Sequence, residues 1–158
     1  MRQLSHLIRR FYASLGARWP SPAGQTLVAE LLSRVESEIF WSQPVPDLAH
    51  ALRSTRVIIE TSPQRADLGR AALLHDVGKR HSGIGTIRRA IATGLSIIMK
   101  RTSGRMAGYL DHGAIGADEL ARVGCEDLVV QFARYHHASR PGHLSSEDWE
   151  TLVRADNE

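Results

Sequence analysis

The sequence predicts an all-α fold, a single bundle of about seven or eight helices. Apolar residues recur three and four positions apart along most of the chain, and no convincing period-two alternation indicates a strand. Proline, glycine and capping residues separate the apolar segments. With 158 residues, the chain is long enough to bury a core and short enough to form one domain. We expect residues 1–24 to be an amphipathic helix with a linker, and residues 25–158 to be the helical domain.

Four helices are expected in the first half of the chain. The N-terminal one repeats apolar residues at helical spacing before the Pro- and Gly-containing break at 19–24. The second, over 25–40, has one apolar stripe made of Leu27, Leu31, Val35 and Ile39. Asp47 is the predicted N-cap of the third, over 48–60. The fourth starts near residue 62 and is expected to end at Gly78, a residue type that commonly follows a helix C-terminus.

The second half of the chain also reads as helices joined by short breaks. Apolar periodicity predicts helices over 87–100, 105–124 and 126–137, and the glycines of 105–124 predict that this helix is bent or split. A loop follows at 140–143. Ser145, with Asp148 three residues later, predicts a capping box at the start of the last helix, over 146–158.

Composition excludes some functional classes. The single cysteine, Cys125, excludes an internal disulfide framework, and its acidic neighbours would raise the pKa of the thiol, so we interpret it as a packing residue. No apolar run approaches the length of a membrane span, and the N-terminus lacks the continuous apolar region of a signal peptide. We therefore expect a cytoplasmic protein that does not contact a membrane.

Charge is unevenly distributed along the chain. The net charge is only +3, yet residues 77–110 contain seven basic residues and no acidic one. Such a block is usually a solvated surface, but beside a candidate metal site it also suits a phosphate-bearing substrate. The sequence pI of about 9.5 raises the alternative of a nucleic-acid-binding protein. That alternative is disfavoured because Tyr109 is the only aromatic residue among those basic positions.

The adjacent His75 and Asp76 follow four apolar residues, so they are expected to be buried. Three interpretations are open: the pair lies at the surface by chance, it is a hydrogen-bonded structural pair, or its two residues are ligands of a metal ion. Further candidate ligands lie on the apolar lines of other predicted helices: His50, His112, His136 and Asp156. Each of them alone is more often a hydrogen-bonded core residue. Together they favour a metal site.

In order along the chain, His50, the pair His75–Asp76 and Asp156 resemble the H…HD…D pattern of the HD superfamily of metal-dependent phosphohydrolases. The segments HDVGK, DHGAIGADELARVG and FARYHH also resemble blocks of that family, so the similarity runs from about residue 45 to residue 156. The resemblance implies an HD-domain-like helical bundle that binds a divalent cation. After its HH pair the chain reads ASRPGHLS, which departs from the branch of the family that cleaves cyclic-di-GMP.

The additional histidines imply a site for two ions. His112 and His136 match positions at which family members with two metals carry further histidines, and His137 adds a possible ligand. The resemblance thus implies metal ligation by His50, His75, Asp76, His112, His136, His137 and Asp156, with Asp76 bridging the ions. The ions would be Fe, Mn, Zn, Co, Ni or Mg, between which the sequence does not choose.

Two basic residues are candidates for contact with a substrate phosphate. Lys79 lies one turn beyond His75; it is either an exposed helix-terminal lysine or, as the match to the HD motif favours, a catalytic group that binds phosphate. Arg53, one turn after His50, is a second candidate. The expected function is hydrolysis of a phosphate ester or anhydride in a small, nucleotide-like substrate. The alternative is a nucleotide-sensing or regulatory module with little turnover. The oligomeric state stays open.

Overall fold

The computed structural model describes residues 18–82 and 112–158, and the predicted all-α class is confirmed there. The predicted N-terminal helix, the predicted helix over 87–100 and the part of the helix predicted over 105–124 that precedes residue 112 lie outside these residues. The described residues form seven α-helices and one 3-10 helix, η1: α2 (Pro22–Leu31), α3 (Arg34–Trp41), α4 (Val45–Thr61), α5 (Ala66–Leu74), η1 (Val77–Ser82), α8 (His112–Arg122), α9 (Asp127–Tyr135) and α10 (Ser146–Asp156).

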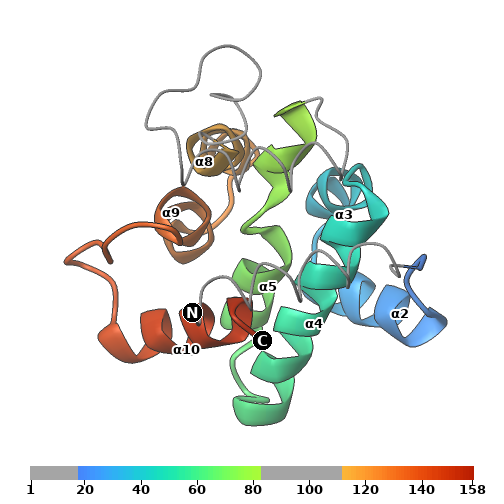
Figure 1. The fold of residues 1–158 in the computed structure, drawn as a ribbon, viewed down its shortest axis with the longest axis horizontal. Coiled ribbons are helices and arrows are strands. Elements are labelled where there is room, and N and C mark those ends of the chain that lie inside the picture. The colour runs from blue at the N-terminus through green and yellow to red at the C-terminus, as the bar shows by residue number, and fades with distance from the viewer. Residues whose placement is uncertain (1–17, 83–111) are drawn as a thin grey trace, which may run out of the picture.

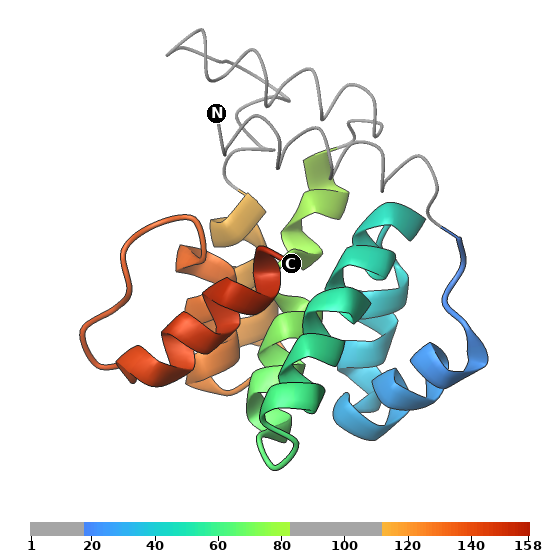
Figure 2. The same ribbon diagram turned by 60° about the horizontal axis from the view of Figure 1, so that its bottom comes forward.

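Helix α5 and η1 run through the middle of the molecule (Figure 1). Helices α3 and α4 lie on one side of them, and α8 and α9 lie on the other. Helix α10 packs on α4 and α5, so the C-terminal end of the chain lies beside the α5–η1 junction (Figure 2). Helices from the first half of the chain and its last helix therefore meet at this junction.

The core between these helices is apolar and continuous. Its largest fully buried apolar side chains come from six helices: Phe40, Leu48, Ile58, Leu68, Leu73, Leu74, Leu120, Phe132 and Leu152. Trp149 is also buried and meets Phe132 edge to face, with ring centroids 5.4 Å apart. These contacts anchor α10 to α9 although α10 is the last helix of the chain.

The single helix predicted over 25–40 is wrong, because the structure divides it at Leu32 and Ser33. The Ser33 hydroxyl accepts a hydrogen bond from the Glu36 amide, and the Glu36 carboxylate accepts one from the Ser33 amide at 2.9 Å, which completes a capping box. Because α3 starts anew at Arg34, a different face of this segment points to the core from the one predicted for a single helix over 25–40. Val35, expected in the core, is 48 % exposed, and Glu36 is buried in its place.

Glu36 is buried because it links three parts of the fold. Its carboxylate accepts hydrogen bonds from Arg70 on α5 at 2.8 Å and from the Cys125 thiol at 3.0 Å, in addition to the cap at Ser33. Burial raises the pKa of Cys125 to about 12, and the neighbouring Glu36 carboxylate adds to the shift. The interpretation of Cys125 as an unreactive packing residue agrees with this environment.

Two other predicted helix ends also differ. Asp47 lies in the first turn of α4, and Pro44 is the N-cap residue, so the helix starts earlier than expected. Helix α5 ends at Leu74, with His75 as its C-cap, instead of continuing to Gly78. Ser145 is the N-cap of the last helix, as predicted, because its hydroxyl accepts from the Asp148 amide. The Asp148 carboxylate does not complete the predicted capping box and instead accepts from Arg65 at 2.6 Å.

Gly78 does not end a helix; it allows η1 and α8 to approach each other closely. A Cβ atom built there would lie 1.9 Å from the carbonyl oxygen of His112 and 2.7 Å from the amide nitrogen of Gly116. Only a residue without a side chain allows η1 to pack this tightly on the first turns of α8. The start of α8 is thereby held next to Asp76.

No helix among the described residues is long and apolar enough to cross a membrane. The expected cytoplasmic location stays a prediction.

Candidate metal centre

The ends of several helices converge where α5 passes into η1. His50 comes from the second turn of α4, His75 and Asp76 from the α5–η1 junction, and Asp156 from the last turn of α10. His112 begins α8, and His136 is the C-cap of α9. The predicted convergence of His50, His75, Asp76 and Asp156 is confirmed by the contacts that join them.

The first group of side chains contains His50, His75 and Asp156. Oδ1 of Asp156 lies 2.8 Å from Nε2 of His50 and 3.1 Å from Nε2 of His75. The two imidazole rings meet edge to face, with centroids 5.5 Å apart. All three residues are buried. These contacts link residues 81 and 106 positions apart in the chain.

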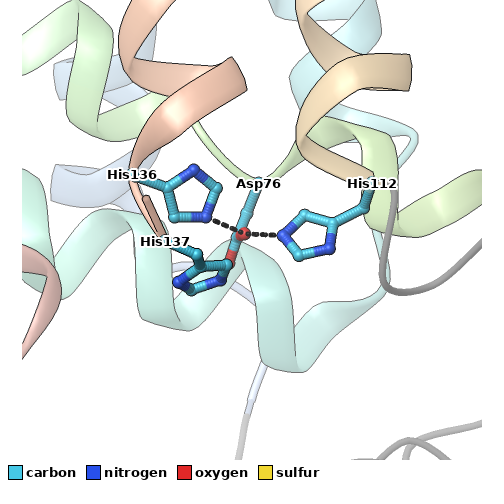
Figure 3. A group of neighbouring side chains, drawn as sticks. All are labelled: Asp76, His112, His136 and His137. Atoms are coloured by element: carbon cyan, nitrogen blue, oxygen red, sulfur yellow. Dashed lines mark ion pairs between the residues drawn. The ribbon is translucent and has the colours of Figure 1, made fainter. Parts of the chain in front are cut away.

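The second group contains His112, His136 and His137 around the other side of Asp76 (Figure 3). Oδ1 of Asp76 lies 3.3 Å from Nε2 of His112 and 3.4 Å from Nε2 of His136. His137 is more exposed, and its ring lies beside that of His136 with centroids 3.9 Å apart. This group adjoins the first, because the ring of His136 meets that of His75 edge to face with centroids 5.0 Å apart.

Asp76 therefore contacts one group through each carboxylate oxygen. Oδ1 faces His112 and His136, and Oδ2 lies 3.4 Å from Nε2 of His75. Oδ2 also forms an ion pair with the Lys79 ammonium group. A carboxylate with one oxygen toward each set of ligands has the arrangement needed to bridge two cations.

Helix C-termini fix the orientation of two of the imidazole rings. Nδ1 of His75 donates to the carbonyl oxygen of Ala72 at 2.9 Å, and Nδ1 of His136 donates to that of Ala133 at 3.0 Å. These carbonyls belong to the last turns of α5 and α9, where the helix ends before it can supply an amide to donate to them. Because Nδ1 of each ring is used in this way, Nε2 is the nitrogen that faces the site, and in the neutral ring it is the one that carries the lone pair.

The electrostatics keep both aspartates ionised. Burial by itself would raise the pKa of Asp76, but Lys79, His75 and the contacts with His112 and His136 hold this pKa well below its usual range. Burial would likewise raise the pKa of Asp156, and the charge of His75 and the bonds from His50 and His75 lower it instead. Ionised carboxylates are the form that binds metal.

The histidines of the two groups respond differently to the same burial. Burial lowers the pKa of His136, and partial burial together with the neighbouring His136 lowers the pKa of His137 to about 3. These two rings are therefore neutral, as metal ligands must be. For His75, burial acts in the same direction, but Asp76 and Asp156 outweigh it and raise the pKa.

The residues present fit a metal ion. Within the described residues, Oδ1 of Asp76 and Nε2 of His136 are buried without a hydrogen-bond partner, an arrangement that is costly unless a ligand satisfies them. The candidate donor atoms of Asp76, His112, His136 and His137 lie within 4.8 Å of one another, and so do those of His50, His75 and Asp76. Donors about 2.0–2.2 Å from a shared ion lie roughly 3–3.6 Å apart, close to the separations observed here.

Other basic and histidine residues have defined surroundings. Arg53 is exposed on α4, one turn after His50, and its contact with a substrate phosphate stays a prediction. Arg80 donates to the carbonyl of Ile39 at 2.8 Å and pairs with Glu119, so it connects α3 to α8. His81 also contacts Glu119, and His143 contacts Asp127. Neither histidine belongs to the two ligand groups.

The burial of Lys79 against Asp76 was missed by the sequence analysis, which weighed only an exposed lysine or a phosphate ligand. Lys79 is 6 % exposed. In a 3-10 helix, side chains three residues apart lie on the same side, and the Lys79 amide donates to the Asp76 carbonyl at 3.0 Å. The three-residue separation of Asp76 and Lys79 was therefore the sequence signal for their contact. It could be interpreted only once the structure showed that α5 ends at Leu74.

Residues 26–157 match the family described as HD domain, which is all of the chain except its first 25 residues and the last one. This chain belongs to the HD-domain family. Members of this family bind divalent metals and are in general metal-dependent phosphohydrolases, although some are not catalytic. No curated protein and no solved structure matches the chain. The matched range is longer than the resemblance quoted from the motifs, because it includes α2 and α3.

Proposed function

We propose that this HD-domain protein is a metal-dependent phosphohydrolase with two divalent cations, acting on a small nucleotide-like substrate. The observation that carries the proposal is the position of Asp76, whose two oxygens face two separate groups of histidines. His50, His75 and Asp156 would hold one cation, and His112, His136 and His137 would hold the other. A family member with a site for one cation would not need the second group.

Two cations at such a site would supply a water nucleophile of lowered pKa and stabilise negative charge on the phosphate. The chain's own residues prepare this site. Asp76 and Asp156 provide the anionic oxygens, and the carbonyls of Ala72 and Ala133 orient the rings of His75 and His136. Lys79 places an ammonium group beside Asp76, where it would donate to a substrate phosphate oxygen.

The choice of substrate is supported by charge. Five of the seven basic residues between 77 and 110 lie outside the described residues, and Lys79 is buried at the centre. Arg53 adds an exposed positive charge on α4 near His50. Positive charge around a metal site favours a polyanion, and phosphates of a nucleotide have this charge at a size suited to one domain. We propose no nucleic-acid partner and no membrane partner.

A regulatory HD module that senses a nucleotide is the second candidate. It shares the scaffold and the basic residues, and it differs in having no turnover. A complete set of ligands favours the enzyme, because a sensing module does not need an activated water molecule. The two candidates predict the same binding and opposite results in a turnover assay.

The experiment combines metal analysis with an activity screen. The purified protein is stripped of metal and reloaded with Mn²⁺, Fe²⁺, Co²⁺, Ni²⁺, Zn²⁺ or Mg²⁺; bound metal is counted, and phosphate release is then measured from nucleotides and dinucleoside polyphosphates. The expected result is about two ions per chain and turnover with at least one metal. Asp76→Asn should lose both, because a neutral amide cannot bridge two cations.

His143→Ala is the matched control. His143 is an exposed histidine that contacts Asp127 outside the site, so its loss should leave metal content and turnover unchanged. One ion per chain in the wild type would contradict the binuclear proposal. Tight nucleotide binding without hydrolysis under any metal would refute the enzyme and favour the sensing module.

A further inference from the structure

Lys79 occupies an unusual position for a lysine. Its side chain is buried, and its ammonium group pairs with Oδ2 of Asp76. The pairing is built into the backbone, since η1 directs residue i+3 onto residue i, and the packing of Gly78 on α8 fixes the position of η1. A buried ammonium is retained only where a fixed anion compensates for its lost hydration.

The oxygen that Lys79 contacts belongs to one ligand group and not the other. Oδ2 faces His75, which shares Asp156 with His50. Oδ1, on the opposite side, faces His112 and His136. The ammonium charge therefore lies next to the position that would be formed by His50, His75 and Asp156.

We propose that Lys79 is the internal counter-cation of Asp76 in the metal-free protein. It stabilises the buried carboxylate when no ion is bound, and it must move off Oδ2 when a divalent cation takes this oxygen. Lys79 thereby weakens metal binding at the His50–His75–Asp156 position and becomes available to a substrate anion only after the metal has bound. The proposal rests on the metal site of the proposed function but not on turnover.

This role sets Lys79 apart from a purely structural lysine. A structural lysine stabilises the protein equally with and without metal, and its loss weakens or leaves unchanged the binding of metal. A counter-cation has opposite effects on the two states. Its removal destabilises the metal-free protein, because the buried Asp76 loses its ammonium partner, and tightens metal binding, because a repulsive charge is gone.

The test compares Lys79→Met with the wild type and with Lys79→Arg, which keeps the charge. Arg56→Met is the matched control, since it removes one positive charge from an exposed position on α4. Mn²⁺ is titrated into metal-free protein and its binding followed by calorimetry, and thermal unfolding is measured without metal and with saturating Mn²⁺. Should Lys79→Met not fold without metal, Lys79→Gln, whose amide still donates to Asp76, takes its place.

For Lys79→Met or Lys79→Gln we expect one Mn²⁺ to bind about tenfold or more tightly, from the loss of one nearby positive charge. We also expect a lower unfolding temperature without metal and a difference from the wild type that closes at saturating Mn²⁺. Lys79→Arg and Arg56→Met should bind Mn²⁺ as the wild type does. Unchanged or weaker Mn²⁺ binding by the neutral variants would overturn the proposal, as would an unfolding temperature lowered equally with and without metal.

The experiment separates this proposal from the proposed function. If the wild type binds Mn²⁺ and the neutral variants bind it more tightly, the role of Lys79 stands even when no substrate is hydrolysed. If the wild type binds no divalent metal at all, both proposals fail. Hydrolysis with unchanged Mn²⁺ affinity in the neutral variants would keep the function and refute the role of Lys79.

Discussion

Gly78→Ala is the substitution that most directly tests how the fold builds the site. The new Cβ would lie 1.9 Å from the carbonyl oxygen of His112 and 2.7 Å from the amide nitrogen of Gly116. Both atoms belong to the backbone, so no side chain can rotate away. The first turn of α8 must then retreat from η1, and His112, whose carbonyl is the atom displaced, must retreat with it.

The size of the effect follows from these distances. Cβ contacts below 3.0 Å essentially do not occur, so η1 and α8 must separate by about 1 Å or more. Overpacking a close contact typically destabilises a protein by 1–3 kcal/mol, and a clash between two backbones should reach about 3 kcal/mol. For a domain of this size, that corresponds to a decrease of roughly 6–12 °C in the unfolding temperature.

Metal content should change as well. A shift of about 1 Å would break the 3.3 Å contact between His112 and Asp76. The other group of ligands is not in the contact between Gly78 and α8, so the change should leave it in place; it consists of His50, His75 and Asp156. We therefore expect Gly78→Ala to retain about one ion per chain where the wild type retains two. Thermal unfolding and metal analysis of the purified variant provide both measurements.

Gly142→Ala is the control for this prediction, because its Cβ would meet no atom within 4 Å in an exposed loop. It should match the wild type in both measurements. If Gly78→Ala unfolds at the wild-type temperature and keeps the wild-type metal content, the close approach of η1 and α8 does not position His112, and the reasoning is refuted.

Other expected outcomes concern the rest of the fold. Glu36→Gln leaves Arg70 without its buried anion, so it should reduce the free energy of unfolding by about 3 kcal/mol at pH 7. Urea denaturation measures this change, and a decrease of less than about 1 kcal/mol would contradict the prediction. Burial opposes ionisation of Glu36, but its bonds with Cys125, Ser33 and Arg70 lower its pKa, so wild-type stability should be fully present above about pH 4.5 and fall below it, more steeply than in the variant. Cys125 should react slowly with a thiol reagent at pH 8 and faster in Glu36→Gln, and equal rates would show that the carboxylate does not raise the pKa of the thiol. Ser145→Ala should reduce the free energy of unfolding by about 1 kcal/mol, because it removes the N-cap of α10. In this variant, a protease should cut the C-terminal helix faster without metal than with metal bound; equal rates would show that metal binding does not hold α10 in place.

The sequence alone determined the helical class and the set of candidate ligands. Apolar residues at helical spacing predict helices irrespective of how they pack, because this spacing places them on one face. Histidines and aspartates on those faces are expected to point inward, which identified His50, His112, His136 and Asp156 beside the pair at 75–76. Ser145 was identified as a cap because capping is local and depends on residues only three positions away.

Where the prediction of elements failed, a tertiary contact decided the outcome. The stripe over 25–40 was plausible as one helix, but Glu36 gains partners on α5 and at Cys125, 34 and 89 residues away, once α3 starts afresh at Ser33. Gly78 was expected to end a helix by its backbone conformation, and its function is instead to leave room for a helix 34 residues later in the chain.

The division of the site was likewise decided only by the tertiary structure. The sequence identified the candidate ligands but not which of them lie near each oxygen of Asp76. That depends on which helix ends meet at the α5–η1 junction. The burial of Lys79 also depended on this junction: the 3-10 turn after Leu74 places its ammonium group on Asp76, and α8 packs closely on this turn at Gly78. Periodicity records which side of a helix faces the core, whereas the direction and distance of partners across the core are set by packing, which no local pattern encodes.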